Sequence, residues 1–283
     1  MTMDEKIIYD VPFVDSVFFP TDSSPASERA LAHALAIAMI RQTRFTILHV
    51  GSSKAEWTEF EVVSQMLERW GVLKSDSSRR DVFEQLALRM RTIALNERQP
   101  LPAILDFLRQ SPTDLIVLST GGRTGLARWL QPSKVERVRE KSNTMTLFVP
   151  SSADGFVSAQ TGQFLLTRIL IAVDSEPAPR PALEYAARIA KVVGIPIEVD
   201  LLHVGDVPTA LDLDLPQEDM LNLHKTTRKG NAVKEIVDLA SQRQSNLIMM
   251  TTRGHHGILD AMRGSVTEQV VRKAPCPVLA IPQ

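Results

Sequence analysis

Short, almost wholly apolar runs alternate along the chain with longer stretches whose apolar residues recur at helical spacing. The runs are rich in Val, Ile, Leu and Phe, which is typical of strands, and the amphipathic stretches indicate helices. The expected strands are 14–20, 45–50, 115–118, 144–149, 169–173, 196–204, 247–250 and 278–281. The expected helices are 24–41, 101–108, 126–141, 181–193, 232–243 and 265–273. Strands that are apolar throughout and alternate with helices predict parallel sheet covered on both faces.

The same order of segments occurs twice. Leu-His-Val-Gly at 48–51 returns unchanged at 202–205, and an apolar run that ends in Asp-Ser occurs at 17–23 and at 170–175. Matching segments are 152 to 154 positions apart near the start of the copies but 132 apart later. The first copy therefore carries about 22 additional residues, within roughly 55–90. For this part of the chain we expect a longer helix or a lid-like excursion.

The two copies define the expected domain organisation. A chain of 283 residues favours two domains of ordinary size, placed here at 1–150 and 167–283. The linker between them is placed at 151–166, because its first part is rich in Ser, Gly, Ala and Gln. Each copy ends in an apolar run that would form a sheet edge. We expect the two final strands to pair as a pseudo-dimer within one chain, and a further homodimer stays open.

The composition argues against several classes of function. The formal net charge is −1 and basic residues are interspersed with acidic ones, so no positive field would attract nucleic acid or an anionic membrane. No apolar run reaches the length of a membrane span, and the first residues do not form a secretory signal. The single cysteine, Cys276, favours a reducing compartment. We expect a cytoplasmic protein that binds neither nucleic acid nor membrane.

Ligand chemistry is expected at the carboxyl ends of the strands, where open parallel sheets bind their ligands. In the second copy Asp174 follows the first strand, and a turn with Gly254 and Gly257 follows the fourth. Gly264-Ser265 then opens a helix. Glycine lets backbone N–H groups approach an anion closely, and the N-terminal end of a helix favours negative charge. The pattern predicts a phosphate cradle, and the alternative interpretation is that these are ordinary turn glycines.

Residues 246–281 resemble the C-terminal signature of the universal stress protein family, especially in Thr252-Arg253-Gly254, in 264–268 and in 274–278. The resemblance covers nearly the whole chain, once per copy. ATP-binding members carry Gly, two residues, Gly, nine residues, then Gly followed by Ser or Thr. Gly254 and Gly264-Ser265 match this pattern, whereas Thr251 stands at the first Gly position. The resemblance implies an α/β fold of two tandem, open, doubly wound, parallel five-stranded sheets of the Rossmann-like, adenine-nucleotide-binding type.

The resemblance also implies roles for individual residues. Ala172, Val173 and Asp174 would line the base and ribose, Val204 would hold the base through its backbone, and Met250 would close the pocket. The glycine turn and the helix start would hold the phosphates. The complete candidate set is Ala172, Val173, Asp174, Val204, Met250, Thr251, Gly254, His255, Gly257, Gly264, Ser265, Val266 and Thr267. The implied cofactor is ATP or AMP, with or without Mg²⁺.

The first copy departs further from the same pattern. Ser119 takes the first Gly position, Gly122 the second, and Pro132 replaces the Gly before Ser133. Proline has no N–H to offer to a phosphate. We therefore expect the first copy to bind nucleotide weakly or not at all.

Three functions stay open at this point. The first is an adenine-nucleotide-binding stress-response regulator or sensor that acts on an unknown protein partner. The second is an interaction module of the same fold that has lost nucleotide binding. The third is a slow nucleotide hydrolase with Asp174 as its acid. The sequence shows no nucleophile elbow, no Gly-rich Lys-Ser loop and no paired carboxylates, so no catalytic or metal-binding residue is assigned.

Overall fold

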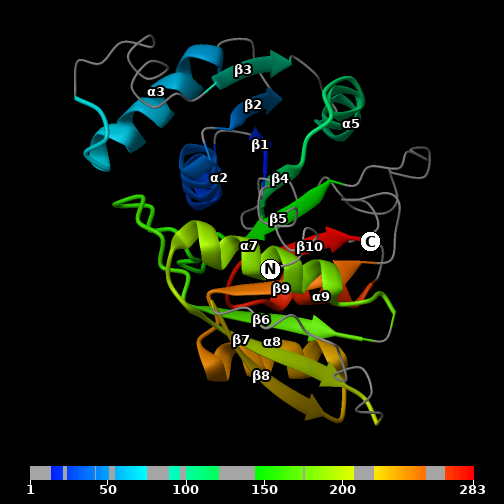
Figure 1. Cartoon of the computed structure of the whole chain (residues 1–283). Helices are drawn as coiled ribbons and strands as arrows, with labels where there is room; N and C mark the ends of the chain where they lie inside the picture. The colour runs from blue at the N-terminus through cyan, green and yellow to red at the C-terminus, as the bar shows by residue number, and fades with distance from the viewer. Residues whose placement is uncertain are drawn as a thin grey trace, which may run out of the picture.

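The computed structural model describes residues 14–21, 24–41, 43–50, 55–74, 89–95, 100–120, 144–174, 176–206, 220–252 and 265–283. Within these ranges ten strands form one continuous sheet, and helices lie on both of its faces (Figure 1). The chain passes from one half of the sheet to the other between its fifth and sixth strands.

The N-terminal half consists of β1 (Ser16–Thr21), η1 (Pro25–Ser27), α2 (Glu28–Arg41), β2 (Arg44–Val50), α3 (Ala55–Arg69), β3 (Arg89–Leu95), α5 (Pro100–Gln110), β4 (Leu115–Ser119) and β5 (Met145–Val149). The C-terminal half consists of β6 (Arg168–Val173), α7 (Arg180–Val193), β7 (Ile197–Val204), β8 (Leu221–Arg228), α8 (Ala232–Arg243), β9 (Leu247–Thr252), α9 (Val266–Lys273) and β10 (Val278–Pro282).

Most of the predicted elements are present. All eight predicted strands occur, with ends shifted by at most two residues, and so do five of the six predicted helices. The sixth predicted helix, 126–141, lies outside the described residues. The helix expected in the additional segment of the first copy is α3, and the rest of that segment, 75–88, is also outside the described residues. The strands β3 and β8 were not predicted.

The strand order corrects the expectation of two separate sheets. The order is β3-β2-β1-β4-β5-β10-β9-β6-β7-β8, so each half contributes five parallel strands to one sheet. The halves join where β5 pairs with β10 in antiparallel fashion. Each of these strands would otherwise expose a row of backbone N–H and C=O groups, and their pairing satisfies both rows. The expected pairing of the two final strands within one chain is thus present.

A pseudo-twofold axis relates the two halves. The ends of β1 and β6 differ by 152 positions, as do those of α2 and α7, and β4 begins 132 positions before β9. Leu147 of β5 pairs directly with Leu279 of β10, and these two residues are themselves 132 positions apart. A residue that pairs with its own counterpart lies on the symmetry axis, so the axis passes between Leu147 and Leu279.

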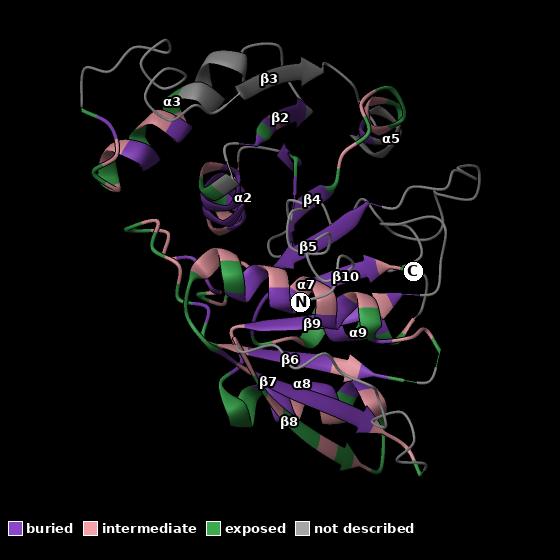
Figure 2. Ribbon diagram, in the orientation of Figure 1, coloured by how far each residue is buried: buried purple, intermediate pink, exposed green. Residues whose placement is uncertain are grey.

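The core consists of two apolar layers, one on each side of the sheet. The first lies beneath α2, α3, α7 and the linker, and the second beneath α5, α8 and α9. Alternate residues of a strand point to opposite faces, so Phe19 belongs to the first layer and Phe18 to the second. Figure 2 shows the central strands buried along their length, whereas β8 at the sheet edge exposes several of its side chains.

The linker is held against α2 by a buried histidine. The backbone N–H groups of Phe156 and Val157 donate to Nε2 of His33 at 3.1 and 3.3 Å, and Nδ1 lies 2.7 Å from the carbonyl oxygen of Arg29. Burial lowers the pKa of His33 to about 4, so the ring is neutral and can accept these bonds at neutral pH. The limits of the two domains, at 150 and 167, stay a prediction.

Candidate functional site

A pocket of about 380 Å³ lies at the carboxyl ends of β6, β7 and β9, beside the first residues of α8 and α9. It is lined by Ala172, Val173, Asp174, Glu176, Pro177, Leu202, Val204, Ala232, Ile236, Met250, Thr251, Thr252, Ser265, Val266 and Thr267. Strand ends and the N-terminal ends of two helices thus meet at one place. This is the position at which open parallel sheets bind their ligands.

Nine of the thirteen residues singled out from the sequence line this one pocket: Ala172, Val173, Asp174, Val204, Met250, Thr251, Ser265, Val266 and Thr267. The other four, Gly254, His255, Gly257 and Gly264, lie outside the described residues. Residues that are 95 positions apart along the chain, from Ala172 to Thr267, are brought together by the parallel strand order.

The floor of the pocket is apolar. Ala172 of β6 lies beside Leu202 of β7 in the ladder, and Val204 follows at the next position on the same face. Met250 of β9 and Ile236 of α8 complete the surface. An apolar surface suits the face of an aromatic ring, which loses little by leaving water.

One side of the rim carries two carboxylates. Asp174 follows β6 directly and is exposed, and Glu176 lies two residues further along the same loop. They are the ionisable side chains among the pocket residues that the structure describes. The end of β6 is fixed by the buried ring of His203, whose Nδ1 lies 3.2 Å from the carbonyl oxygen of Val173. The ring also lies against Gly205, so close that a side chain at 205 would collide with Nε2.

The opposite wall is the beginning of α9. The hydroxyl of Ser265 accepts a hydrogen bond from the N–H of Glu268 at 3.1 Å, and the Glu268 carboxylate pairs with Arg272 at 2.6 Å. Ser265 and Glu268 stand at the spacing of a capping box. Ser265 was predicted to offer its hydroxyl to a phosphate, which stays a prediction; in the structure that hydroxyl caps the helix. The first N–H groups of a helix have no partner within it, which makes this end suitable for an anion.

A second helix also begins at the pocket. Asn231 caps α8 by accepting a hydrogen bond from the N–H of Lys234 at 3.0 Å. Ala232 and Ile236, one turn apart, place their side chains toward the pocket. These two residues, like Leu202, Thr252, Glu176 and Pro177, were not among the predicted site residues. The helical spacing of Ala232 and Ile236 was visible in the sequence, but only the fold shows which strands α8 covers.

Thr251 differs from its counterpart in the other half. Its Oγ1 atom is buried and has no hydrogen-bond partner. The counterpart, Ser119, donates a hydrogen bond from its hydroxyl to the carbonyl oxygen of Ala26 at 2.8 Å. The same position at the end of the fourth strand thus carries a satisfied hydroxyl in one half and an unsatisfied one in the other.

The comparison with protein families decides the classification. The model of the universal stress protein family matches residues 14–150 and 212–282, which is more than half of the chain. This chain belongs to the universal stress protein family. The match is divided over both halves of the sheet, in agreement with the repeat in the sequence and the pseudo-twofold axis in the structure.

Several known proteins resemble this chain in sequence or in fold. One from Methanocaldococcus jannaschii is 27% identical over 145 residues, which is 43% of this chain and 85% of that protein. A universal stress protein from Archaeoglobus fulgidus has the same fold over 95% of this chain and 98% of its own, with a TM-score of 0.58 and 19% identity. A protein of unknown function from Pseudomonas aeruginosa matches 98% of this chain and 94% of its own, with a TM-score of 0.60 and 15% identity. The tandem arrangement is therefore shared with known structures.

The corresponding place in the N-terminal half of this universal stress protein carries different residues at the described positions. Pro20 of β1 stands where the C-terminal half has Ala172, and Pro20 is buried whereas Ala172 is partly exposed. Leu118 stands where the C-terminal half has Met250. The other residues on which the sequence argument relied, Asp22, Gly122, Pro132 and Ser133, lie outside the described residues.

Two further properties concern the described residues of this universal stress protein. No group of three or more His, Cys, Asp or Glu side chains within the described ranges is placed to hold a metal ion. No helix in the same ranges is long and apolar enough to cross a membrane.

Proposed function

We propose that the C-terminal half binds an adenine nucleotide, ATP or AMP, in the pocket between α8 and α9. Some members of the universal stress protein family bind adenine nucleotides, and the observation that carries the proposal is the gathering of nine predicted residues around one pocket. The volume of about 380 Å³ is of the size that small-molecule pockets usually have.

The chemistry of the lining suggests an orientation for the nucleotide. The adenine base lies over the apolar floor formed by Ala172, Val204 and Met250. The ribose lies toward Asp174, because a carboxylate accepts hydrogen bonds from hydroxyl groups. The phosphates then point to the beginning of α9, where Val266 and Thr267 supply first-turn N–H groups. Mg²⁺, when present, enters with the phosphates, because it is usually bound through one or two carboxylates and substrate phosphates.

Under this proposal the protein acts as a regulator and not as an enzyme. Slow turnover is expected at most, because the described pocket contains carboxylates on one side of the rim but no acid and base set around it. Nucleotide binding changes the surface around α8 and α9 and thereby favours or disfavours a protein partner. The C-terminal half carries the site, because Pro20 and Pro132 change the equivalent place in the N-terminal half.

The test is calorimetric titration of the full chain, freed of copurified nucleotide, with ATP and Mg²⁺ and with AMP. Ala172→Leu places three extra carbons on the pocket floor and is expected to weaken binding about tenfold or more. Ala274→Leu is the matched control, because Ala274 is also partly buried but follows the far end of α9. Gly264→Pro, which imitates Pro132 of the first copy, is expected to abolish binding.

One binding event per chain, weakened by Ala172→Leu but not by Ala274→Leu, supports the proposal. No binding by the unmodified chain would reject it and leave the interaction module as the function. The buried, unpartnered hydroxyl of Thr251, at a position where ATP-binding members carry Gly, is the observation that favours this second candidate. Turnover that Asp174→Ala abolishes would instead establish the slow hydrolase.

A further inference from the structure

The hydroxyl of Thr251 is buried and lacks a hydrogen-bond partner among the described residues, although Thr251 itself lines the candidate pocket. Buried polar groups without a partner are uncommon in folded proteins, so each one calls for an explanation. The oxygen is closed to solvent, which points to a protein group that becomes its partner in another conformation.

The equivalent hydroxyl in the N-terminal half indicates which group this is. Ser119 stands 132 positions before Thr251, and its Oγ donates to the carbonyl oxygen of Ala26 at 2.8 Å. Ala26 belongs to η1, in the connection between β1 and α2. Its counterpart 152 positions later is Ala178, in the connection between β6 and α7, and a proline precedes both alanines. The C-terminal half thus retains both the donor and the acceptor, but the donor is not bonded there.

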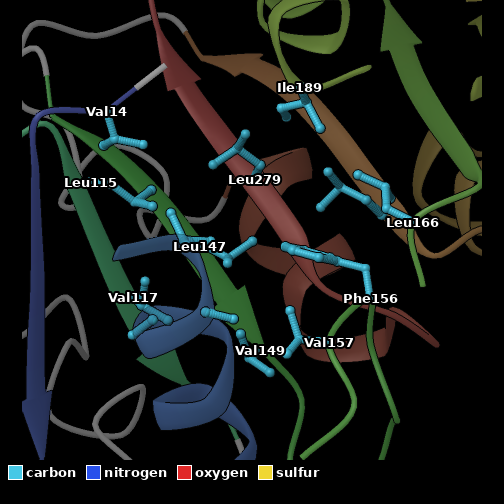
Figure 3. Close-up of a cluster of buried hydrophobic side chains, with 14 of the residues drawn as sticks. Val14, Leu115, Val117, Leu147, Val149, Phe156, Val157, Leu166, Ile189 and Leu279 are labelled. Atoms are coloured by element: carbon cyan, nitrogen blue, oxygen red, sulfur yellow. The ribbon is translucent and has the colours of Figure 1, made fainter. Parts of the chain in front are cut away.

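The donor side of this contact is anchored in the core. Leu115 and Val117 precede Ser119 on the same face of β4, and Figure 3 shows both of them in the buried cluster around the axis. The residues that precede Thr251 on the same face of β9 are buried in the same cluster. Because the strand is fixed, the contact can form in the C-terminal half only if the connection after β6 moves.

The two connections are restrained differently. In the N-terminal half Ser27 donates to the carbonyl oxygen of Ser24 from its N–H at 2.9 Å and from its Oγ at 2.6 Å. The hydroxyl of Thr21 in turn donates to Oγ of Ser27 at 3.4 Å. The counterparts of Ser27 and Thr21 are Pro179 and Val173, which have no hydroxyl, and proline also has no N–H. The connection between β6 and α7 therefore lacks these restraints and is free to take another position.

We propose that residues 176–179 close against β9 when a ligand fills the pocket, and that Thr251 then holds them by donating from Oγ1 to the carbonyl oxygen of Ala178. Glu176 and Pro177 line the pocket, so this closure narrows the pocket around the ligand. The inference rests on the proposed function, with an adenine nucleotide as the ligand. Thr251 is a positioning residue, because it acts through the connection and does not touch the nucleotide.

Closure and ligand binding support each other. A ligand shifts a protein toward the conformation in which the two make more contacts, and here that conformation also satisfies the buried hydroxyl of Thr251. In the N-terminal half the equivalent hydrogen bond from Ser119 is present without any ligand. A connection that responds to the ligand is therefore expected in the C-terminal half, where the pocket lies.

Calorimetric titration of the nucleotide-free full chain, with ATP and Mg²⁺ and with AMP, tests the closure. Thr251→Val keeps the shape of the side chain but removes the hydroxyl, and it is expected to weaken binding about threefold to tenfold, as the loss of one hydrogen bond does. Thr251→Ser keeps a hydroxyl and is expected to bind like the unmodified chain. Ser119→Ala is the matched change in the N-terminal half and is expected to leave the affinity unchanged.

A double-mutant cycle separates closure from a direct contact between Thr251 and the nucleotide. Pro179→Ser gives the connection the N–H and the hydroxyl that Ser27 uses in the other half, and it is expected to tighten binding about threefold by favouring the closed turn. Combined with Thr251→Val, the same change is expected to leave the affinity unaltered. An equal effect of Pro179→Ser in both backgrounds would overturn the closure, because the two residues would then act independently.

The outcomes also distinguish this inference from the proposed function. Nucleotide binding by the unmodified chain that Thr251→Val does not weaken would overturn the closure and leave the proposed function standing. No binding by the unmodified chain would reject both. Weaker binding in Thr251→Val that Thr251→Ser restores, together with the coupling to Pro179→Ser, supports the closure.

Discussion

At the carboxyl end of its first strand the C-terminal half has a small alanine, Ala172, and a pocket opens above it. The N-terminal half has Pro20 at the same place, and this residue is buried. The strand order and the register around the two positions are the same, since Pro20 pairs with Leu48 as Ala172 pairs with Leu202. Two halves with one topology thus differ in the side chain at this position.

The helices differ as well. The N-terminal half carries α3 against α2, where Arg69 pairs with Glu28 at 2.8 Å and a cleft of about 440 Å³ separates the two helices. The corresponding stretch of the C-terminal half is shorter, and much of it, 207–219, is outside the described residues. The two halves thus share one strand order, and they differ in the segments between strands as well as in single strand residues.

Truncation at the symmetry axis gives the largest expected effect. Leu147→Ala and Leu279→Ala each remove a side chain that is 2% exposed, and each is expected to lower the free energy of unfolding by about 2–5 kcal/mol. The two losses should be similar, because the residues face each other across the axis. Urea denaturation of both variants measures them. A loss confined to one variant would mean that the halves unfold separately.

The next prediction uses pH to distinguish His33 of the N-terminal half from its counterpart Tyr185 in the C-terminal half. The pKa of His33 is about 4 in the folded chain and 6.5 when unfolded, so the unfolded chain binds more protons between these values. Stability is therefore expected to fall as pH drops from 6.5 towards 4, by about 3 kcal/mol in total from this residue. The counterpart Tyr185 does not titrate in this range, because the ordinary pKa of tyrosine is about 10 and burial raises the pKa of Tyr185 further. Denaturation at a series of pH values measures the effect.

His33→Gln is the control for that titration, because an amide oxygen accepts hydrogen bonds without titrating. The variant is expected to lose stability at pH 7 but to show a flatter pH dependence between 6.5 and 4. An equally steep dependence in His33→Gln would assign the effect to other groups. Tyr185→Phe should leave the slope unchanged.

The smallest effect concerns the end of the fourth strand in each half. Ser119→Ala leaves the carbonyl of Ala26 without its 2.8 Å hydrogen bond and is expected to cost about 1 kcal/mol. Thr251→Val removes a buried hydroxyl that has no partner, and it should leave stability unchanged or raise it by up to about 1 kcal/mol. Thermal unfolding of the two variants distinguishes these outcomes. A destabilised Thr251→Val would show that this hydroxyl is bonded in solution.

The sequence predicted the central strands well because each is apolar throughout. It did not predict β8, whose sequence Leu-Asn-Leu-His-Lys-Thr-Thr-Arg is largely polar because the strand lies at the sheet edge. Asn222 and His224 extend from it to Glu198 of β7, at 2.8 and 2.6 Å, so side chains that suggest a loop in fact support a strand pair. The sequence of β3 at the other edge, Arg-Met-Arg-Thr-Ile-Ala-Leu, is similarly mixed.

The candidate site could be predicted only where its residues stand in recognisable sequence patterns. Asp174 and Ser265 belong to strand ends and helix starts, which leave recognisable patterns in a sequence. Ala232 and Ile236 reach the pocket only because α8 crosses the sheet beside β6 and β7. The continuous sheet was missed for another reason, since the apolar runs at 147–149 and 279–281 indicate edges but not how their backbones meet.

The antiparallel contact between β5 and β10 also changes how substitutions accumulate. In a symmetric homodimer one substitution appears twice, so both subunits gain or lose a feature together. Here the two sides of the axis are encoded separately, and Pro20 could replace a small residue in one copy without affecting Ala172 in the other. Because both halves belong to one chain, a residue can change in one half and not in the other, while the sheet that they share keeps its strand order.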